Sequence, residues 1–492
     1  MPLKFGTSGV RGLVSNMTDE ECYLYSKAFI EHLKEKTSAR VISLSGDLRG
    51  STPRIKKAVA FAIREEGLDL DNCGDIPTGA LTFYGIQKGR ASIMVTGSHI
   101  PDDRNGIKFN MPWGEILKED EMEISRRYEE LKGKNASKRR LTFDEAGYFA
   151  AGFSLDLGKV NDEARSAYIK RFIDFFPENC LAGIKVVLYE HSSVGRDILR
   201  EIFQSLGAEL VLIGRSEHFI PVDTEAVHDE EQLAAWVQEN RADALISTDG
   251  DADRPLLIDE TGRQVRGDIL GIIVSDFLKA DAVATPVSCN TALEKSAKFK
   301  HISRTRIGSP FVIAAMNELV EAGYKRVTGY EANGGFLTGT DIVSPYTGAM
   351  LTALPTRDAA FPLIAVLFHS LNEKCPLSEL SAHLPPRFMA SGVLKKFPIN
   401  ISNKIVETFT CESEAAAKKY LRESFGEAEG FDYTDGVRMT FSSGDIVHLR
   451  PSGNAPEFRC YTESSSESKA IENNRLVLDI VGKVIRPEME KS

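Results

Sequence analysis

Short apolar runs alternate along the first 385 residues with longer stretches in which apolar residues recur every three or four positions. The short runs are bounded by turn residues and predict buried strands, whereas the longer periodic stretches predict amphipathic helices. The expected strands are 40–44, 91–95, 184–189, 209–213, 244–247, 281–287 and 326–330, and the expected helices are 53–66, 194–206, 231–240 and 310–321. This alternation predicts the α/β class, with mixed, mainly parallel sheets covered by helices.

The pattern changes after residue 385. Residues 407–425 are expected to be helical, and strands are expected over 436–441 and 445–449, which together favour an α+β arrangement. We therefore expect three related α/β domains and a smaller C-terminal α+β domain. Their expected bounds are 1–145, 146–265, 266–385 and 386–492, with the charged stretch 132–140 as a linker.

Each α/β segment carries a polar motif directly after a strand. These motifs begin at Thr96, Thr248 and Glu331. Ligands of open α/β sheets bind beyond the carboxyl ends of the strands. The three motifs are therefore expected to converge on one site.

The motif that begins at Thr248 places Asp249, Asp251 and Asp253 at alternate positions, followed by Arg254. Carboxylates packed this closely repel one another, and a hard divalent cation relieves that repulsion. A solvated acidic turn is the ordinary alternative for an isolated pair of aspartates. Three alternating acids after an apolar strand favour a metal loop, and Mg²⁺ bridging to a phosphate is the expected use.

The motif after strand 91–95 presents Ser98 beside His99, with Lys108 ten residues further on in an expected tight turn. Serine is also a favoured helix cap, so the residue alone carries little weight. A serine hydroxyl is a weak nucleophile until a base or metal activates it. Serine, lysine and a metal loop together suit phosphoryl transfer, which depends on positioning and charge neutralisation.

Three further loops are ambiguous when taken singly. The loop 450–457 offers an arginine, a serine and a glycine-containing turn that can bind an anion, although a surface turn is an equal alternative. The glycine-rich loop 5–12 lacks the ending of a P-loop. The loop 331–335 offers an acceptor and an amide for sugar hydroxyls, or simply a bend.

Composition and charge indicate which partners and which cellular compartment to expect. The 492 residues carry a net charge of −11, which argues against a general nucleic-acid or membrane-surface binder. Seven cysteines without C-x-x-C spacing indicate reduced thiols rather than disulfides or zinc. No signal peptide or membrane span is expected, so we expect a cytoplasmic protein.

Taken together, the loops resemble those of the α-D-phosphohexomutase superfamily, in its phosphomannomutase/phosphoglucomutase branch, over essentially the whole chain. The resemblance implies three α/β domains and a smaller fourth around a central cleft. It also implies that Ser98 is a phosphoserine and, with the three aspartates, a ligand of Mg²⁺. The other catalytic residues that it implies are Arg11, His99, Lys108 and Arg254, and the implied substrate-binding residues are Arg306, Ser309, Glu331, Asn333, Arg450, Ser452 and Asn454.

The sequence departs from the family pattern in two loops. The serine loop, usually T-A-S-H-N-P, reads T-G-S-H-I-P from Thr96 to Pro101. The sugar loop, often G-E-M-S-G-H or G-E-Q-S-G-H, reads Y-E-A-N-G-G from Tyr330 to Gly335, without the histidine. Arg306 and Ser309 stand where the family often has lysine and histidine.

The resemblance implies interconversion of hexose 6-phosphate and hexose 1-phosphate through a bound hexose 1,6-bisphosphate. Mannose phosphate is the expected substrate, with glucose phosphate close behind and glucosamine phosphate as a further alternative. A metal-dependent phosphohydrolase and a non-catalytic sugar-phosphate binder on the same fold are rival interpretations. The partners expected are a small sugar phosphate and no nucleic acid or membrane, for a monomer or homodimer.

Overall fold

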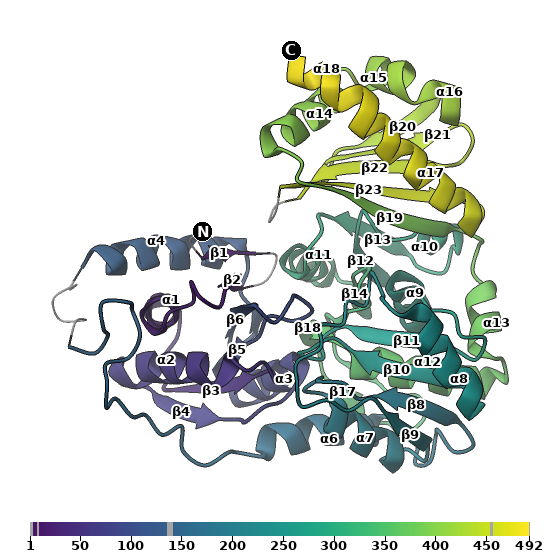
Figure 1. Cartoon of the computed structure of the whole chain (residues 1–492). Helices are drawn as coiled ribbons and strands as arrows, with labels where there is room; N and C mark the ends of the chain where they lie inside the picture. The colour runs from purple at the N-terminus through teal and green to yellow at the C-terminus, as the bar shows by residue number, and fades with distance from the viewer. Residues whose placement is uncertain (1–2, 7–8, 135–140, 453–455, 492) are drawn as a thin grey trace. The chain divides into compact units, whose positions relative to one another are not determined.

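The computed structural model describes residues 3–6, 9–134, 141–452 and 456–491. The chain divides into two compact units (Figure 1). Unit 1 comprises residues 1–283 and 308–381, and unit 2 comprises residues 284–307 and 382–492. The division falls inside strand β12 (Ala282–Pro286) and near the end of helix α13 (Leu377–Ala382).

The first sheet of unit 1 has the order β1-β2-β6-β5-β3-β4, with β7 paired to β6. Its strands are β1 (Lys4–Phe5), β2 (Val10–Leu13), β3 (Val41–Gly46), β4 (Asp69–Asn72), β5 (Ala91–Val95), β6 (Arg104–Met111) and β7 (Gly114–Glu115). The mixed sheet is confirmed, but only β3–β4 and β3–β5 are parallel pairs here. The connection from β5 to β6 is too short for a parallel crossover, so β6 runs back beside β5.

The segment 105–109, expected as a tight turn entering another strand, lies wholly inside β6, so the strand is confirmed and the turn is wrong. Lys108 faces Met94 of β5 in the antiparallel register. The lysine that follows the serine loop is therefore carried by a strand rather than by a turn.

Four helices accompany this sheet, namely α1 (Asp19–Lys36), α2 (Thr52–Glu65), α3 (Thr78–Lys88) and α4 (Lys118–Gly133). Apolar side chains of α1, α2 and α4 and of β3, β5 and β6 form one core, which includes Phe29, Leu44, Ile93 and Phe109. Burial on both faces explains why β5 is a continuous apolar run in the sequence. Residues 132–133 of the expected linker belong to α4, and residues 135–140 lie outside the described residues.

The second sheet has the order β11-β10-β8-β9. Its strands are β8 (Lys185–Tyr189), β9 (Glu209–Ile213), β10 (Ala244–Thr248) and β11 (Pro255–Asp259), with helices α6 (Glu163–Phe175), α7 (Arg196–Ser205) and α8 (Glu230–Asn240). Strands β8, β9 and β10 are parallel neighbours, and β11 returns antiparallel to β10. The turn between β10 and β11 carries the three aspartates.

The third segment continues the alternation. Its elements in unit 1 are α9 (Gly267–Phe277), α11 (Ser309–Glu321), β14 (Val327–Tyr330), β15 (Phe336–Thr338), β16 (Ile342–Val343), β17 (Met350–Leu351), β18 (Leu354–Asp358) and α12 (Ala360–Glu373). Strand β15 pairs with both β14 and β18 in antiparallel fashion. The loop 331–335 therefore connects two paired strands, and β18 ends next to it.

Unit 2 contains an antiparallel sheet of order β19-β23-β22-β21-β20. The strands are β19 (Phe388–Lys395), β20 (Ala428–Asp432), β21 (Val437–Phe441), β22 (Ile446–Pro451) and β23 (Glu457–Ser464). The remaining elements are α10 (Ala292–Lys295), β13 (His301–Thr305), α14 (Ile399–Cys411), α15 (Ser413–Tyr420), α16 (Arg422–Phe425), α17 (Glu467–Ile480), the π-helix η1 (Val481–Ile485) and α18 (Arg486–Lys491). An antiparallel sheet with its own helices is the α+β arrangement expected for this part.

The helical stretch expected over 407–425 is confirmed, although the chain divides it among α14, α15 and α16. The breaks fall at Glu412 and Leu421, whose backbones leave the helical region. Phe409, Ala417 and Phe425, one from each helix, enter the same core. Among the described residues, none of the helices is long and apolar enough to cross a membrane.

Candidate active site

Ser98 lies in the connection between β5 and β6, and its side chain is fully buried. Its φ of 57° is in the left-handed region, which serine rarely adopts. The backbone N–H of Ser98 donates to Oγ1 of Thr96 at 2.7 Å, and its hydroxyl donates to Asp249. The loop thus holds the hydroxyl against the carboxylate loop, with backbone strain of the kind found at functional sites.

Arg49 holds the serine loop in this conformation. Its guanidinium is buried and donates to the backbone carbonyls of Ser98 (2.8 Å), Ile100, Pro101 (2.8 Å) and Arg104 (3.0 Å). Asp47 accepts a further bond from Nε of Arg49 at 3.1 Å. One side chain therefore fixes four carbonyls of an irregular loop.

Gly97 makes room for this arginine. A Cβ at position 97 would lie 2.7 Å from the guanidinium carbon of Arg49. The family pattern usually has alanine here, and glycine avoids a contact between a Cβ and the buried guanidinium.

The three aspartates lie in the turn between β10 and β11, and all three are fully buried. Nζ of Lys108 lies 2.6 Å from Oδ2 of Asp251 and 2.6 Å from Oδ2 of Asp253. Thr78 at the start of α3 also donates its hydroxyl to Asp251. The prediction that residues from the first two α/β segments converge is confirmed for Ser98, Lys108 and the aspartates by these distances.

The donor set fits a hard divalent cation. One carboxylate oxygen from each of Asp249, Asp251 and Asp253 lies within 4.8 Å of the others. Oδ1 of Asp251 and Oδ1 of Asp253 are buried and accept no hydrogen bond. Burial, followed by the charges of Asp251 and Asp253, raises the pKa of Asp249 well above its usual range. Unpartnered buried carboxylate oxygens in this number are what a Mg²⁺ ion would satisfy.

Three other predicted residues surround the aspartates. Nε of Arg254 lies 3.8 Å from Oδ2 of Asp249 and 3.7 Å from Oδ1 of Asp253. Burial and the nearby charges of Arg254 and Arg357 lower the pKa of Arg11 to about 10. Burial, with Arg254 and Arg11 close by, also lowers the pKa of His99, so its imidazole is neutral at pH 7. The cations beside the carboxylates make a place where an anionic group is stabilised.

The predicted sugar loop is linked to the aspartates by a buried arginine, Arg357. Glu331 is buried and accepts a bond at 3.0 Å from Nη1 of Arg357, whose Nε and Nη2 donate to Oδ2 of Asp253 at 3.1 and 2.9 Å. Asn333 uses its side-chain oxygen to accept from the backbone N–H of Gly335 at 3.0 Å, which shapes the loop. Arg357 thus connects the sugar loop to the metal loop.

Ser309, another predicted substrate residue, also lies in unit 1. It begins α11, is buried, and donates to Glu115 at 2.7 Å. Glu115 also accepts from the hydroxyl of Thr356. The hydroxyl of Ser309 is therefore already hydrogen-bonded to a carboxylate of β7.

Unit 2 carries the remaining predicted residues. Nε of Arg450 lies 3.4 Å from Oδ1 of Asp435, and Ser452 is buried at the end of β22. Arg306 is exposed and donates through Nε to the carbonyl of Thr434 at 3.1 Å. Asn454 lies outside the described residues. Within unit 2, Arg306 and Arg450 both lie next to the segment 434–435.

Sequence reasoning missed Arg49, Arg357 and Thr78. Each of them is isolated in the sequence, and an arginine is normally expected at the surface. The sequence contains one indication of the two buried arginines. It has glycine at positions 97 and 335, where the family has larger residues. In both cases a buried arginine fills the space of the missing side chain.

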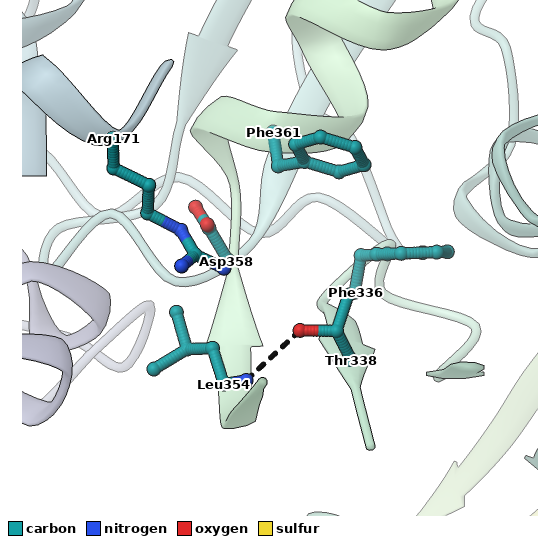
Figure 2. Close-up of a pocket in the computed structure, with 6 residues that line it drawn as sticks. All are labelled: Arg171, Phe336, Thr338, Leu354, Asp358 and Phe361. Atoms are coloured by element: carbon teal, nitrogen blue, oxygen red, sulfur yellow. Dashed lines mark hydrogen bonds between the residues drawn. The ribbon is translucent and has the colours of Figure 1, made fainter. Parts of the chain in front are cut away.

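A small cavity lies beside β18, between Leu354 and Asp358 of that strand and Phe336 and Thr338 of β15 (Figure 2). It has a volume of about 10 Å³, which is room for at most one water molecule. Arg171 and the aromatic rings of Phe336 and Phe361 line it, together with Asp358, the residue after Arg357. The cavity is a packing feature beside the site and is too small to hold a sugar phosphate.

A serine hydroxyl held against three carboxylates with the spacing of a metal site, at the ends of α/β strands, is the arrangement that suits an enzyme of phosphoryl transfer. Family comparison narrows that class. Models of phosphoglucomutase/phosphomannomutase α/β/α domains I, II and III match residues 2–134, 166–262 and 266–388. The chain belongs to the phosphoglucomutase/phosphomannomutase family, within the α-D-phosphohexomutase superfamily, and is a phosphohexomutase, an isomerase of sugar phosphates.

Individual relatives agree with this assignment. A phosphomannomutase of Sinorhizobium fredii is 43% identical over 472 residues, which cover 95% of this chain and 96% of that protein. A phosphomannomutase of Salmonella muenchen is 41% identical over 470 residues, covering 95% and 93%. The solved structure of a phosphoglucomutase/phosphomannomutase family protein from Burkholderia thailandensis shares the fold, with a TM-score of 0.73 at 18% identity, and the match covers 97% of this chain and 98% of that one.

Proposed function

We propose that this phosphohexomutase interconverts mannose 6-phosphate and mannose 1-phosphate. Two relatives above 40% identity along nearly the whole chain are both phosphomannomutases, which favours mannose over glucose or glucosamine phosphate. A protein with this substrate is proposed to work in the cytoplasm, as a monomer or homodimer. Glucose phosphate is the second candidate because the domain models describe both activities.

Ser98 is proposed to carry the phosphoryl group. The bond between its Oγ and phosphorus breaks as the free hydroxyl of the bound hexose monophosphate attacks phosphorus, and a hexose 1,6-bisphosphate forms. The bisphosphate turns over in the site, and its other phosphoryl group returns to Oγ of Ser98. The product is the isomeric monophosphate, and no phosphate is released.

Asp249, Asp251 and Asp253, with an oxygen on Ser98, are proposed to hold one Mg²⁺. When bound, the ion neutralises negative charge on the transferring phosphoryl group. Lys108, Arg11 and Arg254 stabilise the same charge from the protein side, and the proposed catalytic set includes His99 next to the serine. His99 Nδ1 lies 3.3 Å from Oγ of Ser98, and because that hydroxyl donates to Asp249, a neutral ring with its proton on Nδ1 can donate to the serine oxygen.

The remaining predicted residues are proposed to bind substrate. Glu331 and Asn333 accept sugar hydroxyls, and Arg450, Ser452 and Asn454 bind the phosphate that is not reacting. Arg306 and Ser309 complete the proposed substrate-binding set. The proposed domains are 1–145, 146–265, 266–385 and 386–492, so each of the four contributes at least one loop.

The observation that carries the proposal is the hydrogen bond from the buried Ser98 hydroxyl to Asp249 inside the cation-binding cluster. The test compares the wild type with Ser98→Ala, using mannose 1-phosphate, glucose 1-phosphate and glucosamine 1-phosphate side by side. Ser26→Ala is the matched control, because Ser26 is an equally buried serine whose hydroxyl only bonds the carbonyl of Cys22 in its own helix.

The expected result is turnover that is fastest with mannose 1-phosphate, lost in Ser98→Ala and kept in Ser26→Ala. Intact-mass measurement and peptide mapping should locate one phosphate on Ser98. Phosphate on another residue would remove the nucleophile assignment. A clear preference for glucose 1-phosphate or glucosamine 1-phosphate would replace the proposed hexose and leave the mutase chemistry in place.

A further inference from the structure

Arg357 is one of the largest fully buried side chains of the protein, and it lies at the end of β18, far in sequence from the other site loops. Its guanidinium contacts two acids at once. Nη1 binds Glu331 of the sugar loop, while Nε and Nη2 bind Oδ2 of Asp253 in the metal loop. This geometry uses the planar fork of arginine in full, and a lysine has no equivalent.

The side chain of Arg357 occupies the space that a residue larger than glycine would need at position 335. A Cβ built on Gly335 would lie 2.5 Å from Cδ, 2.6 Å from Cγ and 3.0 Å from Cβ of Arg357. The backbone of Gly335 does not have a positive φ, so its conformation does not itself demand glycine. Glycine is needed at position 335 because the side chain of Arg357 occupies the space of a Cβ.

Gly335 is also the position at which the sugar loop of the family ends in histidine. We propose that Arg357 replaces that histidine: it enters the loop from β18, holds Glu331 for the sugar and ties the sugar loop to Asp253. In this role Arg357 is a positioning residue that acts through Glu331. The inference rests on the proposed assignment of Glu331 to sugar binding.

The end of β18 is built to hold this arginine in place. The carboxylate of the next residue, Asp358, accepts the hydroxyl of Tyr168 at 2.6 Å and the backbone N–H of Ala360 at 2.9 Å. Figure 2 shows Asp358 at the tip of the strand, with Arg171 pointing toward it. The backbone that carries Arg357 is therefore fixed before any substrate binds.

The position of Arg357 also leaves the metal loop free to bind a cation. Oδ2 of Asp253 takes the bonds from Arg357 and Lys108, while Oδ1 of the same carboxylate accepts none. Oδ2 is thus occupied by Arg357 and Lys108, whereas Oδ1 accepts no hydrogen bond and lies 3.7 Å from Nε of Arg254. A side chain at position 335 in place of Arg357 would leave Glu331 without this link to Asp253.

The test is an exchange of side chains between positions 357 and 335. Arg357→Ala should lower kcat/KM for mannose 1-phosphate by roughly 10- to 100-fold, mostly through KM, because Glu331 loses a charge-assisted hydrogen bond. Arg357→Lys should fall between this variant and the wild type. Adding Gly335→His to Arg357→Ala should restore at least about tenfold, a single hydrogen bond to a charged group. Adding Gly335→Ala instead is the matched control and should restore none.

Thermal unfolding tests the shared space independently of the substrate. Gly335→Ala alone should lower the unfolding temperature, because the new methyl group meets Arg357, and it should have little effect once Arg357→Ala has removed that contact. An equal effect of Gly335→Ala in both backgrounds would overturn the exchange. Equal activity of the two double variants would also overturn it, because the histidine would then contribute nothing.

Two controls separate this inference from the proposed function. If the wild type fails to turn over any of the three hexose phosphates, the proposed function fails, and the thermal comparison still decides whether positions 335 and 357 share one space. If Glu331→Gln leaves KM unchanged while the thermal coupling is present, the sugar-binding assignment fails and with it the positioning role.

Discussion

Arg49→Met should damage the serine loop more than any other single change outside the carboxylates. The guanidinium of Arg49 donates to four backbone carbonyls between Ser98 and Arg104 and to Asp47. It also stacks on the ring of Phe219, 3.8 Å from the ring centroid. Methionine keeps an unbranched side chain as far as the position of Nε and removes every one of these donors.

The loss of stability in Arg49→Met depends on the acceptors that lose the guanidinium. Each bond to a charged donor is worth about 1.5–3 kcal/mol, but the five do not add, because Pro101 and Arg104 are exposed and water can reach their carbonyls. Asp47 also keeps the hydroxyls of Thr52 and Thr96. Removing one partner of a buried ion pair costs about 3–5 kcal/mol, which we take as the total. At about 2 °C for each kcal/mol, the unfolding temperature should fall by about 6–10 °C.

Activity should fall as well, because Ser98 depends on the loop for its left-handed backbone. A shift of about 1 Å at a reacting group costs about 100-fold in rate, and we expect that loss in kcat. The assay is turnover of mannose 1-phosphate together with thermal unfolding, with Arg64→Met as the control, since Arg64 is exposed near the end of α2. An Arg49→Met protein with the kcat of the wild type and an unfolding temperature within about 1 °C of it would refute the reasoning, since only surface changes are that small.

Three other predictions concern the metal, the histidines and the phosphate. Chelation with EDTA should abolish turnover, and Asp251→Asn should weaken Mg²⁺ binding at least about tenfold by titration calorimetry; full activity without metal would contradict the loop's role. Burial lowers the pKa of His191 and of His448 to about 4, below the 6.5 of an unfolded chain. The unfolded chain therefore binds more protons between pH 6.5 and 4, so the free energy of unfolding should fall as pH falls through this window, by about 3 kcal/mol for each histidine, and His448→Gln should show a smaller fall. Arg450→Ala should weaken substrate binding by about 10- to 100-fold while phosphate remains on Ser98, as measured by calorimetry and intact mass; lost phosphorylation with unchanged affinity would move Arg450 to the reacting centre.

The strands that carry the site were predictable because they are buried on both faces. Strand β5 was predicted with its bounds at Ala91 and Val95, and β10 within one residue of Thr248. A continuous apolar run that stops at a polar motif marks the carboxyl end of such a strand. The aspartates were predictable for a similar reason, because their close spacing needs a charge partner wherever the chain places them.

The buried arginines were not predictable from local pattern. Arg49 and Arg357 have no periodicity around them, and their partners are backbone carbonyls or acids far away in the sequence. The break at Glu412 was hidden for a different reason. Phe409 and Ala417 keep helical spacing across it, so the apolar pattern reads as one helix although the chain turns.

The division of the chain into two discontinuous units has a consequence for synthesis on the ribosome. Residues 284–307 belong to unit 2 but are translated before 308–381, which belong to unit 1. At about 5–20 residues per second, the rest of unit 2 takes roughly 5–20 s to appear. During that time the nascent chain already contains all of unit 1, and Thr291 and Ile307 still lack Glu463 and Asp435, which accept hydrogen bonds from their backbone N–H groups in the folded protein. Residues 284–307 are therefore available for a chaperone to bind until the rest of unit 2 has been synthesised.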